Sequence, residues 1–361
     1  MMNSELVSLK DINIGKIERK LKAIAKEIID TTGTTDKIGL LDGKMGIAIF
    51  FYELSRWTKN KDYENFADGL IDEIFDKINK NEVPFHFSGG LEGIAWGIEY
   101  LSENKFIEGD TNEILAELDD KVYQHYIDID KTRVNSTEQL IGNGFYMLAR
   151  YKKINAFGDN TQKYIYKRYI SDIVNNLYYC IDNNLIETKE PLIYNIVWHL
   201  PLILIFLGKA YNADIQREKI VKMAEQLTPT VLSLLPMQHA NRLFLLFGMY
   251  SFFINYKIKD WDSQIRLLED QTSIKKILSE EMNNKKYNLL MGYSGIFFIL
   301  SSFNQFPTNF NKNNYNVEHL LDEICLPMQN RKNKTDISLL NGLTGKALGI
   351  LMGLKNNLFR L

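Results

Sequence analysis

The sequence predicts an all-α protein, specifically an α/α toroid (a double α-barrel) of seven helical hairpins in one domain over residues 1–361. The first observation is a motif, Gly-x-x-Gly followed by an apolar stretch, which begins at Gly43, Gly90, Gly292 and Gly342. The second is its spacing, which is 47 residues from Gly43 to Gly90 and 50 residues from Gly292 to Gly342. A period near 50 residues is typical of repeat architectures with one supersecondary unit per repeat.

The first unit shows what each repeat contains. Residues 16–32 place apolar side chains, from Ile17 to Ile28, on one face of an amphipathic outer helix. After the glycine pair, residues 47–54 are apolar on nearly every side, which predicts an inner helix that is buried all round. One unit is therefore an outer helix, a glycine-bearing loop and an inner helix.

The other units follow in order. Outer helices are expected at residues 63–80, 112–126, 162–182, 215–235, 263–281 and 317–328. The third motif is incomplete, because its two glycines, Gly142 and Gly144, are separated by one residue instead of two. The fourth and fifth inner helices lack the motif and are expected to begin at His199 and near His239. Their place follows from the 150 residues between Gly142 and Gly292, which leave room for two intervening units.

Glycine at the start of an inner helix has two physical explanations. Inner helices that begin at one mouth of a ring crowd their first turns, and a residue without Cβ lets the backbones approach. Glycine also permits a positive φ where the loop turns into the helix. Simple capping of isolated helices would explain any single pair, but four copies in register favour the repeat.

Composition excludes several classes of protein. Hydrophobic residues at 45%, charged residues at 24% and a net charge of -2 describe a globular protein with no expected nucleic-acid or anionic-membrane partner. The most hydrophobic segment, residues 193–207, is interrupted by polar residues and proline and is too short to span a bilayer. The N-terminus carries no signal-peptide pattern, and Cys180 and Cys325 fit a reducing compartment. We therefore expect a cytoplasmic protein.

Three motifs carry a resemblance to a known family: Leu41-Asp42-Gly43-Lys44-Met45-Gly46-Ile47-Ala48, Gly90-Leu91-Glu92-Gly93-Ile94-Ala95 and Gly342-Leu343-Thr344-Gly345. They resemble the lanthionine synthetase C (lanthipeptide cyclase) family, a seven-fold α/α toroid, and the resemblance extends from Ile17 to the end. It implies a role in maturing ribosomally synthesised peptides, because the family's cyclases add a cysteine thiol to a dehydrated Ser or Thr. In the family, zinc held by two Cys and one His binds the thiol and lowers its pKa.

The zinc ligands that the resemblance implies are missing from this sequence. Residues 238–243 take the place of the first family cysteine, and Leu290 and Met291 stand where the family has a Cys-His pair. Leucine and methionine do not match the N and S ligands that catalytic zinc prefers. We therefore expect no metal and no other cofactor, and the zinc site is interpreted as lost.

A new metal site of His86, His199 and His239 is the alternative. Its ligands would need metal distances of about 2.1 Å, and unit two is expected to lie across the ring from units four and five. Helix-capping or repeat-bridging roles for these three histidines are therefore favoured.

Two further family positions retain acid–base chemistry. Glu138 falls where the family has Asp, and His199 falls on the family histidine that opens the fourth inner helix. The resemblance implies that both are acid/base residues, so we hypothesise that Glu138 and His199 are catalytic. Spacing alone does not bring two side chains within about 3 Å, and a capping role for Glu138 stays open.

Other polar residues at the same mouth are candidate substrate-binding residues: His86, Gln238, His239, Asn241, Arg242, Tyr293 and Asn341. Inner-helix N-termini that point the same way predict a mild anion-attracting rim, which would suit an acidic peptide.

Three functions remain open, and with them whether the chain is an enzyme. The first is a cyclase-like protein that acts on a precursor peptide without zinc. The second is a non-enzymatic scaffold that binds the peptide or docks a dehydratase or another modifying enzyme. The third is an unrelated toroid glycosidase, which would need two carboxylates from Asp42, Glu92 and Glu138.

Overall fold

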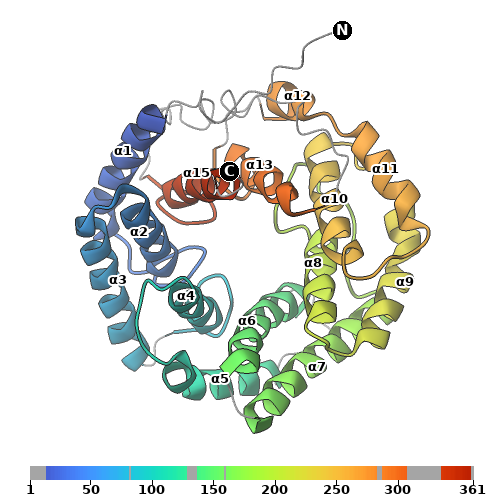
Figure 1. The fold of residues 1–361 in the computed structure, drawn as a ribbon, viewed down its shortest axis with the longest axis horizontal. Helices are drawn as coiled ribbons and strands as arrows, with labels where there is room; N and C mark the ends of the chain where they lie inside the picture. The colour runs from blue at the N-terminus through green and yellow to red at the C-terminus, as the bar shows by residue number, and fades with distance from the viewer. Residues whose placement is uncertain are drawn as a thin grey trace.

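The computed structural model describes residues 14–80, 83–127, 136–157, 160–282, 287–306 and 335–358. The regular elements in these ranges are all helical, and Figure 1 shows them as two concentric rings. The all-α toroid expected from the sequence is therefore confirmed. None of the helices in the described ranges is long and apolar enough to cross a membrane.

The outer ring consists of α1 (Ile14–Thr32), α3 (Lys61–Asn79), α5 (Thr111–Ile127), α7 (Asn160–Asp182), α9 (Arg217–Ser233), α11 (Trp261–Gln271) and the short α12 (Ile274–Lys276), which continues into a π-helical turn, η2 (Ile277–Glu281). The inner ring consists of α2 (Lys44–Thr58), α4 (Leu91–Glu103), α6 (Ser136–Phe157), α8 (His199–Asn212), α10 (His239–Phe253), α13 (Tyr293–Ser302) with a 3-10 turn, η3 (Phe303–Gln305), and α15 (Leu343–Leu358). The expected outer helix at 317–328 lies outside the described residues.

Inner helices are largely buried, as their composition predicts. In α2 every residue from Lys44 to Ser55 is buried. The last inner helix, α15, packs against both α13 and α2, so the two ends of the chain meet and the ring closes (Figure 1).

The second glycine of each intact motif lies directly under its own loop. A Cβ at any of these positions would overlap the carbonyl oxygen of the residue six positions earlier, in the pairs Gly46–Leu40, Gly93–Phe87, Gly295–Leu289 and Gly345–Leu339. Close approach is therefore why glycine is needed. The positive-φ explanation is wrong, because the first glycines Gly43, Gly90 and Gly292 have φ of -144°, -119° and -129°.

The folded-back loops cap the inner helices with backbone carbonyls. In the second unit the Leu91 N–H donates to the Pro84 carbonyl at 2.8 Å, and the Gly90 N–H donates to the His86 carbonyl at 2.8 Å. The Leu343 N–H likewise donates to the Asp336 carbonyl at 3.0 Å. These N–H groups are therefore not available to an anion, and the expected anion-attracting rim is not formed by them.

Loops of different units are also joined to one another by backbone hydrogen bonds. The Ile196 N–H donates to Leu290 at 3.0 Å, and the Leu290 N–H donates to Leu340 at 3.0 Å. The Leu340 N–H donates to Leu41 at 2.9 Å, and the Leu41 N–H donates to Ser88 at 2.7 Å. This chain of bonds links units four, six, seven, one and two at the N-terminal ends of the inner helices.

Two elements differ from the sequence prediction. Helix α6 begins at Ser136 and runs through Gly142 and Gly144. In the other units the glycine makes room for the carbonyl of a loop, whereas these two glycines make room for side chains of neighbouring units. A Cβ on Gly142 would lie 2.6 Å from the Phe87 Cβ. The predicted outer helix at 263–281 is broken after α11, where the Ser273 hydroxyl accepts the Lys276 N–H and starts a new helix.

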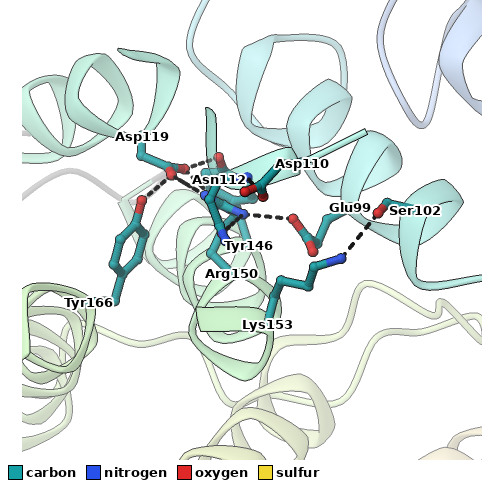
Figure 2. Close-up of polar contacts among 9 residues, drawn as sticks. All are labelled: Glu99, Ser102, Asp110, Asn112, Asp119, Tyr146, Arg150, Lys153 and Tyr166. Carbon is teal, nitrogen blue, oxygen red and sulfur yellow. Dashed lines mark hydrogen bonds and ion pairs between the residues drawn. The ribbon is translucent and has the colours of Figure 1, made fainter. Parts of the chain in front are cut away.

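A buried arginine joins three consecutive units (Figure 2). Arg150 on α6 is 0% exposed and donates to Glu99 on α4 at 2.8 Å and to Asp119 on α5 at 2.9 Å. The hydroxyls of Tyr146 and Tyr166 also donate to Asp119, so both oxygens of this buried carboxylate accept hydrogen bonds from protein groups. A buried charge network of this kind fixes the relative position of the helices that supply it.

Replacing Gly93 by alanine should destabilise the protein, because the new methyl group would overlap the Phe87 carbonyl. We expect a loss of about 2–4 kcal/mol in the free energy of unfolding, measured by urea denaturation. Gly69→Ala is the matched control, since nothing lies within 4 Å of its added Cβ on outer helix α3. It should stabilise the protein by up to about 1 kcal/mol, and equal effects of the two variants would contradict the close-approach explanation.

Substituting Arg150 by methionine should leave Glu99 and Asp119 buried without their cation. The expected loss is about 3–5 kcal/mol, again from urea denaturation. Lys121→Met is the control, because Lys121 pairs with Glu117 at 2.7 Å on the exposed face of α5. Its effect should be below about 1 kcal/mol. A small effect of Arg150→Met would show that the network does not hold the ring together.

Candidate functional site

The structure brings Glu138 and His199 to the same end of two packed inner helices. His199 is the first residue of α8, Glu138 lies in the first turn of α6, and the two helices pack against each other. Burial lowers the pKa of His199 below its ordinary value near 6.5, and the carboxylates of Glu138 and Glu187 oppose this shift. The imidazole is therefore neutral at pH 7 and able to accept a proton, with two acids placed to stabilise the cation that would form.

Glu187 was missed by the sequence reasoning. It lies in the connection between α7 and α8, outside every motif, and its side chain is exposed. Its influence on His199 depends on how this connection folds back over the mouth.

Gln238 and Asn241 in unit five hold the α7–α8 connection in place. The Gln238 side-chain oxygen accepts the Tyr194 N–H at 2.7 Å, and the Asn241 amide donates to the Pro191 carbonyl at 2.9 Å. Glu190 of the same connection accepts the Met237 N–H at 2.8 Å. These two predicted substrate-binding residues therefore already have protein partners.

His239 and Arg242 contact the break between α11 and α12. The Arg242 guanidinium donates to the Gln271 carbonyl at 2.6 Å, and the Ser273 N–H donates to the His239 Nδ1 at 3.2 Å. Burial and the nearby guanidinium lower the pKa of His239. Both side chains therefore join an inner helix to the outer ring.

The remaining candidate residues lie in separate surroundings. The His86 Nδ1 accepts the Gly89 N–H at 3.0 Å within its own loop. The Tyr293 hydroxyl donates to the Leu278 carbonyl at 3.1 Å, and Asn341 is exposed. His86, His199 and His239 thus have different neighbours. Across the described part of the chain, no group of three His, Cys, Asp or Glu side chains is placed to hold a metal ion.

The residues between α10 and α13 do not fit the family's zinc ion. Tyr194 enters this space from the α7–α8 connection, and its ring packs edge-on against Phe244 with centroids 6.4 Å apart. The tyrosine is 0% exposed, and a Cβ on Gly295 would lie 2.9 Å from its hydroxyl oxygen. Leu290 and Met291 offer neither thiolate nor imidazole, and the Gln238 oxygen is occupied by Tyr194. No catalytic step is therefore assigned to a metal at these positions.

Three carboxylates at the mouth have different surroundings. Asp42 pairs with Lys37 at 3.1 Å, and Glu138 is exposed. Glu92 is 1% exposed, its Oε1 accepts the Asn143 amide at 3.4 Å, and its Oε2 has no hydrogen-bond partner. Burial raises the pKa of Glu92 to about 8. Glycoside hydrolysis requires two carboxyl groups that face each other, and these surroundings single out Glu92 alone among the three.

The pKa of Glu92 should make the stability of the protein depend on pH. Because the folded-state pKa is raised above 4.5 to about 8, the folded state binds this proton more tightly than the unfolded state, and stability falls as pH rises through this window. Glu92→Gln should remove the penalty. We expect it to stabilise the protein by up to about 4 kcal/mol at pH 8 and to have little effect at pH 4.5, in urea titrations at both values. A pH-independent difference would contradict the buried-acid assignment.

Comparisons with known proteins agree with this geometry. Residues 34–195 match the model of the family described as lanthionine synthetase C-like protein. Among solved structures, nisin cyclase matches with a TM-score of 0.63 and 16% sequence identity, over 93% of each chain. A search of curated proteins found no match. The resemblance to the lanthionine synthetase C-like family that the motifs predicted is thus confirmed, by the family model over residues 34–195 and by the fold over nearly the whole chain.

Proposed function

We propose that this chain acts in the maturation of ribosomally synthesised modified peptides as a lanthipeptide cyclase-like protein that works without the family's zinc. The observation that carries the proposal is that Glu138, in the first turn of α6, and His199, at the start of α8, lie at the same end of two packed inner helices. The positions that would hold zinc carry Gln238, Leu290 and Met291 instead. The substrate is a precursor peptide that carries a cysteine and a dehydrated Ser or Thr.

The proposed step is an addition across a carbon–carbon double bond. The His199 imidazole removes the proton from the cysteine thiol, and the sulfur attacks the β-carbon of the dehydrated residue. A carbon–sulfur bond forms, the π bond breaks, and the imidazolium returns the proton to the α-carbon. Glu138 and Glu187 favour the imidazolium between these two proton transfers. No atom is lost, and His199 ends the cycle neutral.

The scaffold function remains the second candidate, and one surface favours it. Leu192 and Met237 are 94% and 85% exposed, and they lie on two loops that Glu190 ties together. The Met237 N–H donates to Glu190, two residues before Leu192, and exposed apolar surface is typical of docking sites. On this proposal the surface holds the precursor peptide or a dehydratase, and the chemistry belongs to the partner.

The catalytic proposal is tested with the purified chain and a dehydrated precursor peptide. Ring closure does not change the mass of the peptide, so free thiols are counted by alkylation followed by mass spectrometry. His199→Ala should slow ring closure by about 100-fold, and Glu138→Gln by a smaller factor, because proton transfer is lost while peptide binding persists. Peptide affinity is followed in parallel by fluorescence anisotropy.

His125→Ala serves as the control, because His125 lies on outer helix α5 and stacks on Phe85. It should leave the rate of ring closure unchanged. A double variant of Glu138 and His199 that closes rings as fast as the parent would refute catalysis by this pair. Stoichiometric zinc in the purified protein would refute the zinc-independent mechanism. Loss of peptide or dehydratase binding in a Leu192→Ser, Met237→Ser variant, with no ring closure by the parent, would favour the scaffold.

A further inference from the structure

The inner ring encloses a cavity of about 840 Å³ that none of the proposed mouth chemistry uses. This volume lies within the range of about 300–1,000 Å³ that is typical of small-molecule sites. Its walls are apolar, with an aromatic strip in which Phe87 packs on Trp96 with centroids 6.2 Å apart and Trp96 stacks on Tyr100 at 5.6 Å. Phe145 and Phe298 add further aromatic surface from α6 and α13.

The exposed side chains of the cavity lining are all at one end. They are Glu103, Lys152, Asn155, Lys209 and Asn212, and they lie at or near the C-terminal ends of α4, α6 and α8. At the other end, Leu40 and Leu339 of the mouth loops are buried lining residues. The cavity therefore has an apolar interior, apolar mouth-loop residues at one end and a polar opening at the opposite face of the ring.

Among the charged residues that line the polar opening, Lys209 adds a positive charge beyond the Lys152–Glu103 pair. Lys152 forms an ion pair with Glu103. Within the described residues, the Lys209 ammonium has neither an ion-pair nor a hydrogen-bond partner. Burial and the charge of Lys152 lower the pKa of Lys209, and Glu103 opposes this shift. Lys209 is exposed in the cavity lining. A ligand carboxylate beside it would offset both the partial burial of its ammonium and the repulsion from Lys152.

The apolar interior of the cavity disfavours a peptide as its ligand. A peptide in the cavity would bury backbone N–H and C=O groups against aromatic and aliphatic walls, and each unpaired group would cost free energy. A hydrocarbon chain carries no such groups. The C-terminal ends of three helices carry partial negative charge, which disfavours an anion at the opening unless a lysine offsets it.

We propose that this cavity binds a long-chain aliphatic carboxylate, with its hydrocarbon chain along the aromatic strip and its carboxylate on Lys209. The lining of this cavity includes neither Glu138 nor His199, the residues proposed for the mouth chemistry. The proposal does not depend on the cyclase-like function, because it concerns binding to the purified full chain alone.

Isothermal titration with palmitate, octanoate and hexadecanol tests the proposal. Palmitate should bind with one site per chain, and octanoate much more weakly, since each buried methylene contributes about 0.8 kcal/mol. Lys209→Met should weaken palmitate binding by about fivefold, the value of an exposed ion pair, and leave hexadecanol binding unchanged. Absence of palmitate binding to the parent chain would overturn the proposal, and so would equal losses for both ligands.

A second variant tests the location of the hydrocarbon chain. Ala149 lines the cavity from α6, and Ala149→Trp should fill the space and abolish palmitate binding without lowering the thermal transition. Leu267→Trp is the matched control, because Leu267 is 41% exposed on outer helix α11. Palmitate binding that survives Ala149→Trp in a folded protein would place the site elsewhere. Displacement of palmitate by an apolar heptapeptide at equal concentration would show that the cavity accepts peptides and refute the assignment.

Discussion

The approach of a loop carbonyl to a glycine at the start of four inner helices, α2, α4, α13 and α15, is the constraint on which this ring depends. The first turn of each of these inner helices is buried, so its N–H groups need protein partners in place of water. The loop supplies carbonyls by folding back over the first turn, and only a residue without Cβ leaves room for it. The same loops also bond to one another through Leu41, Leu290 and Leu340, in the chain of backbone hydrogen bonds that joins units four, six, seven, one and two.

Units four and five lack the glycine motif, and side chains perform the same task there. The Glu281 carboxylate accepts the N–H groups of His239 and Ala240 at 2.6 and 2.9 Å. Glu190 and Gln238 fasten the α7–α8 connection, which brings Tyr194 between α10 and α13. Only one of the two places where the family has zinc ligands, residues 238–243, lies in a unit without the motif. Leu290 and Met291 directly precede the intact motif of unit six.

The sequence predicts the ring because apolar stripes and glycine spacing are local signals, and it places His199 at a helix start correctly. It does not reveal Glu187, Tyr194 or the start of α6, because these depend on contacts between units. A signal for such contacts does exist. The pairs Glu92–Asn143, Glu99–Arg150 and Glu103–Lys152 are separated by 51, 51 and 49 residues, which is one repeat period. Complementary polar residues one period apart on inner helices mark neighbours in the ring.

The two ends of the inner ring carry different chemistry on the same helices. His199 begins α8, and Lys209 lies ten residues later, about 15 Å along the helix axis. The buried Arg150 network fixes α6, which packs against α8, relative to α4 and α5. Without a metal to lower the thiol pKa, thioether formation at the mouth would rely on such fixed positioning of base and substrate. A carboxylate on Lys209 would be too far from the imidazole to exchange protons with it, so substitutions at one end separate the two activities.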